Sequence, residues 1–438
     1  MWKIVFSCFG LFLFSSSQVF PQETFDLPDL VDRILSENYQ IRILKNEEVI
    51  NENNNTLGNA GFLPVVSLSG GRSNTINNTK QKLFNGDIRE GKNAENTNLN
   101  GLIRVDWNIF NGFGMFVRRD QLNLLKTISQ EETRYLVEQT ITDVAGLYYQ
   151  LVRGRLRLEN FEKTLGVSRF RHDLEKKKLG VGSSYALLYN QALIDYNSDS
   201  LLVIDQLRVN KSLEIRINRI INRNPDLQVG TINELDLEQF DNPGSLVAAA
   251  SAHNRDLKLA DLSELIAETN LKIQKADMYP TLDVFAQYAY NRSTNEIGVT
   301  ESNRSYGGQY GFTVRFNLYN GRNERREVRN AQVVAQNTVL AKEDIVTEIE
   351  ATLLDLFYQH ASLTKQLSIA EQNVSAAERS QFIAREQLEK QAISGYDFRL
   401  TQLSVINAYN TVTELRYNLK ALEIELNRLT GRLAEKYL

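Results

Sequence analysis

The sequence has little of what disulfide-stapled domains and metalloproteins are built from. Its 438 residues include one cysteine, three histidines and six prolines. The single cysteine, Cys8, excludes a disulfide framework and a cysteine-based zinc site. The histidines stand far apart and form no ligand motif. Because proline is scarce, long stretches of the chain contain nothing that interrupts a helix.

An excess of one charge and long apolar runs are also missing. The 50 lysines and arginines nearly balance 54 aspartates and glutamates, and the formal net charge of −4 argues against a general nucleic-acid binder. After the N-terminus no stretch reaches the ~18 apolar residues of a transmembrane helix. Walker, HExxH and GxSxG motifs are absent as well. We therefore expect no enzyme, no cofactor and no metal site.

The first residues are typical of a secretory signal. Lys3 precedes an apolar run over residues 4–14, and three serines follow at 15–17. We interpret residues 1–22 as a signal peptide, cleaved at about residue 17 to 23. The run is shorter than the ~20 residues that span a bilayer, and an N-terminal anchor is the other interpretation. Cys8 lies inside the apolar run, where lipidation is not expected.

The remaining chain is one unit written twice. Five residues recur 216 positions later: Leu30, Asn38, Asn54, Ala60 and Pro64 as Leu246, Asn254, Asn270, Ala276 and Pro280. From WNIFNG (107–112) and FNLYNG (316–321) onward the offset is 209. A loop before residue 107 absorbs the difference. We expect repeat one over residues 23–223, an inter-repeat equatorial segment over 224–243, and repeat two over 244–438. The period is that of a duplicated domain rather than a solenoid.

Each repeat contains two segments in which apolar and polar residues alternate. This period of two predicts four amphipathic strands of about ten to fourteen residues. They form two hairpins, over residues 63–111 and 280–320. The asparagine-rich stretches 74–98 and 291–305 are expected to be the loops between paired strands.

Heptad spacing predicts coiled-coil helices in the rest of each repeat. One stripe contains Ile345, Ile349, Leu353, Leu356, His360, Leu363, Leu367, Ala370, Val374 and Ala377; another contains Leu415, Leu419, Leu422, Leu426, Leu429 and Leu433. We expect His360 to be packed and hydrogen-bonded. Long helices over 112–179 and 321–393 would be rods of about 100 and 110 Å.

Shorter helices are expected over 185–223 and 396–433, and one before each hairpin. By length, we expect 185–223 to stack end to end with 244–278, and 396–433 with 29–62, beside the long helices.

Four strands are too few to close a barrel in lipid. Only helices or closed barrels satisfy every backbone group there, and small barrels have about eight strands. Copies of the chain must therefore share a barrel. A dimer gives eight strands and a trimer twelve. We favour the trimer because about eight strands leave no open lumen.

Leu63-Pro64 and Tyr279-Pro280 before strands, and WNIFNG and FNLYNGR at strand ends, resemble the outer-membrane efflux family typified by TolC. The resemblance covers roughly residues 24–433. It implies a homotrimer in which an all-α coiled-coil barrel in the periplasm carries a 12-stranded transmembrane β-barrel in the bacterial outer membrane. It also implies a passive duct of a tripartite efflux pump or type I secretion system, which docks a periplasmic adaptor and an inner-membrane pump.

The resemblance also assigns roles to the two turns that join the long and short helices. It implies adaptor docking at these tips: Gly180, Val181, Gly182, Ser183, Ser184, Ile393, Ser394 and Gly395. Asp397 matches an acidic position at the periplasmic entrance, and a helix N-cap is the other interpretation of this residue. Tyr185 takes the matching place in repeat one, and Leu400 is not acidic, so a two-ring acidic gate is not predicted.

One alternative function stays open, a secreted soluble coiled-coil scaffold or adhesin with ordinary hairpins. Lipid contact requires a continuous apolar band with aromatic residues at its rims. Six aromatic residues suit such rims: Trp107, Tyr288, Tyr290, Tyr306, Tyr310 and Tyr319. The sequence does not indicate the cargo.

Overall fold

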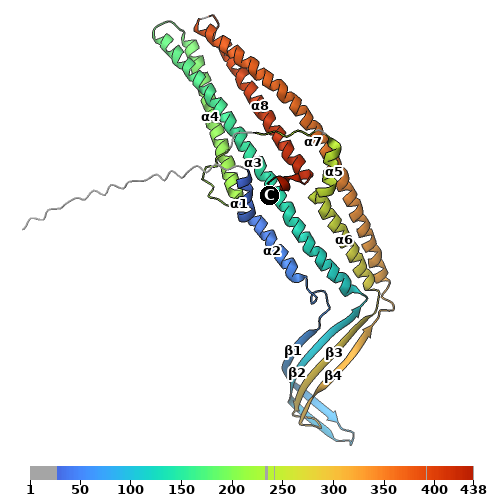
Figure 1. The fold of residues 1–438 in the computed structure, drawn as a ribbon. Helices are drawn as coiled ribbons and strands as arrows, with labels where there is room; N and C mark the ends of the chain where they lie inside the picture. Colours follow the sequence, from blue (N-terminus) through green and yellow to red (C-terminus); the bar gives the residue numbers. More distant parts are fainter. Residues whose placement is uncertain (1–26, 232–234, 241, 391, 438) are drawn as a thin grey trace, which may run out of the picture.

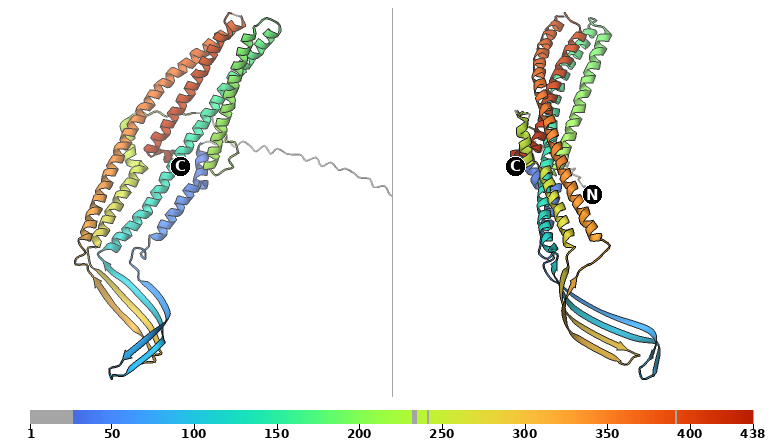
Figure 2. Two further views of the ribbon diagram at one scale, coloured as in Figure 1. Left: turned by 180° about the vertical axis from the view of Figure 1, so that it is seen from behind. Right: turned by 90° about the vertical axis from the view of Figure 1, so that its right-hand side faces the viewer.

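The chain forms a long body with a β-sheet at one end and two helical turns at the other. The computed structural model describes residues 27–231, 235–240, 242–390 and 392–437 (Figure 1). The expected signal peptide at 1–22 lies outside the described residues. Helices run side by side away from the sheet (Figures 1 and 2).

The two halves are built from the same elements in the same order. The first half contains α1 (Leu27–Glu37), α2 (Tyr39–Asn54), β1 (Val65–Lys82), β2 (Ile88–Asn111), α3 (Gly114–Gly180) and α4 (Ala186–Ile220). The second contains α5 (Pro243–His253), α6 (Arg255–Ala276), β3 (Thr281–Asn295), β4 (Ser302–Arg315), α7 (Asn323–Glu389), α8 (Gly395–Leu429) and α9 (Arg432–Tyr437). Both ends of α7 follow those of α3 by 209 residues, and so do both ends of α8 those of α4.

The four strands form one antiparallel sheet in the order β1-β2-β3-β4. The expected loops over 74–98 and 291–305 were wrong, because the strands continue through most of both stretches. In the first hairpin Ile76 pairs with Glu95, and in the second Thr294 pairs with Ser302. The strands are 18, 24, 15 and 14 residues long. Alternation of apolar residues ends earlier, but backbone pairing in water does not require it.

Each expected short helix before a hairpin is broken at an asparagine, which corrects the continuous helices over 29–62 and 244–278. The Asn38 side chain accepts the backbone N–H groups of Gln40 at 2.9 Å and Ile41 at 3.2 Å, and therefore caps α2. Asn254 caps α6 in the same way, accepting the N–H of Leu257 at 3.1 Å.

The same two asparagines join helices end to end. Asn38 Nδ2 donates to the carbonyl of Ile220 at 3.1 Å, at the end of α4. Asn254 Nδ2 donates to the carbonyl of Leu429 at 2.9 Å, at the end of α8. The expected pairing of the stacked helices was therefore wrong: α4 meets α2 and α8 meets α6, each within its own repeat. Helix lengths alone could not distinguish these pairings.

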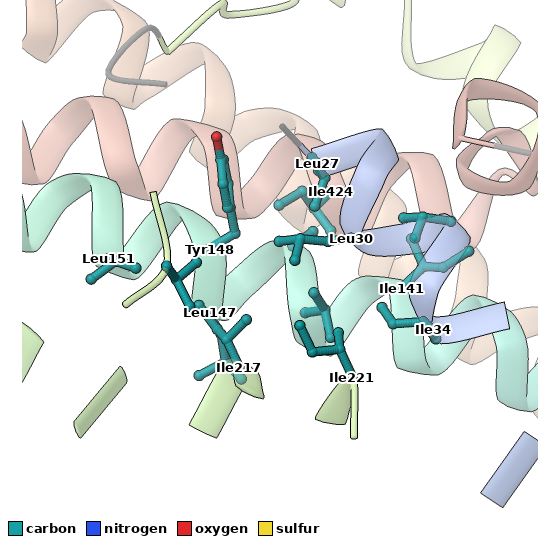
Figure 3. Close-up of a cluster of buried hydrophobic side chains, with 14 of the residues drawn as sticks. Leu27, Leu30, Ile34, Ile141, Leu147, Tyr148, Leu151, Ile217, Ile221 and Ile424 are labelled. Atoms are coloured by element: carbon teal, nitrogen blue, oxygen red, sulfur yellow. The ribbon is translucent and has the colours of Figure 1, made fainter. Parts of the chain in front are cut away.

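The largest apolar cluster lies where these helix ends meet, halfway along the body. Leu30 and Ile34 of α1 pack with Ile141 of α3, and Ile217 of α4 joins them (Figure 3). All four are fully buried. Each such side chain contributes roughly 1.5–3 kcal/mol by leaving water. This cluster fixes the two helix stacks to the long helix between them.

The heptad stripe of the last long segment is confirmed. Five of its leucines are buried: Leu415, Leu419, Leu426, Leu429 and Leu433. His360 is buried against Phe240, with ring centroids 5.2 Å apart. The expected hydrogen bond is not found at its Nε2, which lacks a partner within the described part of the chain. The nearby Glu423 Oε1 instead accepts the backbone N–H of Glu238 at 2.9 Å.

Two searches of the described residues found nothing. None of the helices there is apolar enough over a sufficient length to cross a membrane. No group of three or more histidine, cysteine or acidic side chains in the described ranges could hold a metal ion.

Candidate functional site

One face of the sheet is apolar and exposed across all four strands. Val66, Val105, Ala286 and Tyr310 lie level with one another in the register. The same face carries Leu68, Ile103, Trp107, Leu282, Val284, Tyr288, Phe312 and Val314. Tyr310 is 88% exposed. A continuous apolar patch of this kind marks an interaction or membrane surface.

The opposite face of the sheet is polar. Arg104 Nε binds Asp106 at 2.7 Å, and Arg104 Nη1 donates to Gln287 Oε1 at 2.9 Å. Gln287 Nε2 in turn donates to Gln309 Oε1 at 2.8 Å. This ladder of hydrogen bonds crosses three strands. A sheet that is apolar on one face and polar on the other is suited to separate lipid from water.

Most of the expected rim aromatics lie on the apolar face. Tyr290 pairs directly with Tyr306 at the end farther from the helices. Trp107 stands near the helical end and donates through Nε1 to the carbonyl of Phe62 at 2.9 Å. Tyr288 and Tyr310 lie between these two levels rather than at a rim. Tyr319 follows β4 and is exposed.

The first tip connects α3 to α4 and is exposed to solvent. Gly180 is the last residue of α3, and Val181 is 80% exposed. Gly182 has a φ of +72°, a left-handed conformation that glycine adopts without strain. Ser183 N–H donates to the Lys178 carbonyl at 2.8 Å, which closes the turn. Ser184 Oγ donates to the Glu175 carboxylate at 2.7 Å.

The second tip starts α8 with a capping box. Ser394 Oγ accepts the Asp397 N–H at 3.1 Å, and the Asp397 carboxylate accepts the Ser394 N–H at 3.3 Å. Ile393 is half-buried beside Gly395. Asp397 is therefore the third helical residue of the box, and its interpretation as the N-cap itself was wrong.

The match between Tyr185 and Asp397 was also wrong. Tyr185 is the N-cap of α4, as Ser394 is of α8, so Leu188 stands level with Asp397. The earlier match counted from the glycines of the turns, but the turns differ in internal spacing. Only the second tip carries a carboxylate at this level.

Behind the tips, a buried ion pair connects the two repeats. Arg399 of α8 donates two hydrogen bonds of 2.8 Å to Asp199 of α4. The two side chains are 12% and 2% exposed. Burial lowers the pKa of Arg399, but the hydrogen bonds and charge of Asp199 outweigh this effect and hold the pKa above its usual range. Ser168 of α3 donates to the same carboxylate.

Sequence reasoning missed this network. Gln402 Nε2 also joins it, donating to the Thr164 carbonyl at 3.1 Å. No periodicity relates positions 200 residues apart. The available signal was that Asp199 and Arg399 each stand among apolar residues of a helix.

An open groove lies between α3 and α7 beside the tips. It has a volume of about 800 Å³ and includes Phe170, Arg171, Phe382, Arg385 and Phe398 among its lining residues. Phe170 and Phe382 are more than half exposed, at 56% and 66%. Apolar rings beside cationic side chains are suited to binding an amphipathic protein segment.

Comparisons with known proteins agree with this geometry. The family model described as outer membrane efflux protein matches residues 246–432. Among solved structures, CusC superposes with a TM-score of 0.75 at 15% identity, covering 92% of each chain. VceC from Vibrio cholerae has a TM-score of 0.73 at 15% identity, covering 92% of this chain and 96% of its own.

The CmeC outer membrane channel of Campylobacter jejuni has a TM-score of 0.78 at 12% identity, covering 93% of this chain and 85% of its own. No curated protein matches the chain. The resemblance to the outer-membrane efflux family is confirmed: the second half matches the family in sequence, and nearly the whole chain has the fold of TolC-like channels. The expected localisation agrees with the family description, which names the outer membrane.

Proposed function

We propose that the chain is one of three identical subunits of an outer-membrane channel. The channel is a passive duct for a tripartite efflux pump or a type I secretion system and carries out no chemistry. The observation that carries this proposal is the four-stranded sheet, with an apolar exposed face, a polar opposite face and two open edges.

The open edges support sharing of the barrel between copies. β1 and β4 stand at the two edges of the sheet, and neither outer edge is paired with any strand of the described residues. In hydrocarbon each unpaired backbone group costs several kcal/mol. Pairing β1 of one copy with β4 of the next removes every edge, and three copies give a ring of twelve strands. The polar ladder of Arg104 and Gln287 would then face the lumen.

Exposed heptad stripes support contact between copies along the helices. On α4, Leu187, Ile194 and Leu201 are 72%, 63% and 67% exposed. On α7, Val333 and Leu340 are seven residues apart and also exposed. Spacing by seven places each set on one side of its helix, as in a coiled-coil seam. Contact between neighbouring copies would bury both stripes and continue the barrel wall as a helical tube.

The helices would extend into the periplasm, where both exposed tips and the groove between α3 and α7 would meet the adaptor and, through it, the inner-membrane pump. Asp397 would stand at the periplasmic entrance. The exposed apolar sheet face argues against a secreted soluble scaffold, because such a patch would be left in water.

The test separates the two interpretations by location, assembly and transport. We expect detergent-dependent extraction from the outer membrane and a threefold mass by native mass spectrometry. A double-cysteine series between β1 and β4 should give crosslinked trimers, whereas pairs between β2 and the helical tips should give none. Loss of the protein should abolish export of the cargo of its neighbouring pump. A soluble periplasmic monomer would exclude the proposal.

A further inference from the structure

Three arginines form a row across the apolar face of the sheet. Arg72 of β1 pairs with Leu99 of β2, Leu99 pairs with Arg292 of β3, and Arg292 pairs with Arg304 of β4. The strand register therefore places all four residues at one level. Strands lie about 4.8 Å apart, so the row is roughly 15 Å wide. All three arginines are exposed.

The row follows directly after the apolar band. Counting from the helical end, the last apolar level contains Tyr290 and Tyr306, and the arginines occupy the next level. The band runs from the level of Leu282 over about 27 Å along the strands, at ~3.4 Å per residue. A membrane barrel has an apolar band about 25 Å tall. The arginines thus stand where hydrocarbon would give way to headgroups.

The positive charge of the row is not neutralised within the described sheet. No ion pair joins Arg72, Arg292 or Arg304 to a carboxylate of the described residues, and the two adjacent levels contain glycine, tyrosine, asparagine, threonine and serine. Arg292 and Arg304 face each other directly, and like charges in such a pair repel. An anion bound between them would relieve this repulsion.

The aromatic neighbours hold one guanidinium in place. The Arg304 Cζ atom lies 5.6 Å from the ring centre of Tyr290 and 5.7 Å from that of Tyr306. Cation–π contact leaves the edge of a guanidinium free to donate hydrogen bonds. A planar guanidinium binds the oxygens of a phosphate in a bidentate manner.

We propose that this arginine row binds the phosphate groups of lipids in the outer leaflet, such as a phosphorylated glycolipid. The inference rests on the proposed function, which sets the sheet in the outer membrane with its hairpin tips outward. It adds a ligand class to the lipid-facing surface. The row anchors the barrel at the outer rim, and the helical rim of the same face carries no matching arginines within the described strands.

The test measures binding of fluorescent diphosphorylated lipid A to the full-length protein in neutral detergent. We expect the triple variant Arg72→Gln, Arg292→Gln, Arg304→Gln to bind at least tenfold more weakly. The triple Arg→Lys variant should be intermediate, because it keeps the charge and loses the bidentate geometry. The matched control Lys80→Gln, Lys82→Gln, Arg89→Gln removes three positive charges near the hairpin tip and should bind within twofold of the parent.

Three outcomes would overturn the inference: parental affinity in the triple arginine variant, an equal loss in the control, or equal parental binding of lipid A stripped of phosphate. Displacement of the lipid by 1 mM inorganic phosphate would assign the row to free anions instead. Circular dichroism and heat-modified mobility establish that each variant is folded. Fractionation of the parent is measured separately. An outer-membrane trimer without the lipid preference would refute this inference alone, and a soluble monomer would refute the proposed function.

Discussion

Replacing Asp199 by alanine should destabilise the helical body more than any exposed charge change. The substitution leaves the Arg399 guanidinium, 12% exposed, without its two hydrogen bonds of 2.8 Å. Breaking a buried ion pair by removing one partner costs about 3–5 kcal/mol. The Asp195 carboxylate remains 3.7 Å from Arg399 Nε and compensates in part. We therefore expect the lower end, about 3 kcal/mol.

The assay is unfolding of the full-length protein in detergent, followed by circular dichroism at 222 nm. The double variant Asp199→Leu, Arg399→Met removes both charges and should recover most of the loss, because an apolar replacement of a buried pair is often neutral. The matched control is Asp205→Ala on the same helix, whose pair with Arg208 is 66% and 69% exposed. It should cost less than about 1 kcal/mol.

The result that refutes this reasoning is a double variant as unstable as Asp199→Ala. In that case the loss would come from the shape of the site and not from an uncompensated charge. A change below about 1 kcal/mol in Asp199→Ala would equally show that Arg399 finds water or Asp195 at little cost.

Three further predictions compare equivalent positions or conditions. Gly112 and Gly321 have φ of +68° and +72°, but a Cβ at Gly112 would lie 2.2 Å from the Ala276 carbonyl and one at Gly321 meets open space. Gly112→Ala should therefore abolish assembly, whereas Gly321→Ala should cost only the left-handed strain of about 1–2 kcal/mol in unfolding measurements; equal effects would contradict this. Asn254→Asp keeps the cap acceptor but loses the donor to the end of α8, so it should be less destabilising than Asn254→Ala, by about 1 kcal/mol in denaturant midpoints. Burial raises the pKa of Glu138 above 4.5, although the hydrogen bond and charge of Arg255 oppose this. Its contribution is fully present below pH 4.5 and is lost as pH rises through the folded pKa, so the stability advantage of the parent over Glu138→Gln should shrink between pH 4 and 7; a growing advantage would show the opposite sign.

The sequence predicted the elements better than their ends and junctions. Heptads identify the long helices because coiled-coil burial recurs every seven residues. The strands beyond Ser73 were missed because their pairing there depends on backbone groups and not on an apolar face. The breaks at Asn38 and Asn254 had a signal, since asparagine is a preferred N-cap. Each asparagine had been noted only as a recurring residue of the duplication.

The duplication separates residues that maintain the fold from residues that differentiate the two halves. The capping asparagines and the left-handed glycines occur in both repeats at the same offsets, as symmetric construction requires. The arginine row does not: 216 residues after Arg72 stands Tyr288, and 209 residues before Arg304 stands Glu95. The three arginines reach one level only through the pairing of unrelated positions in four strands. Inheritance from a single ancestral hairpin therefore does not explain the row, and a requirement at that level of the sheet does.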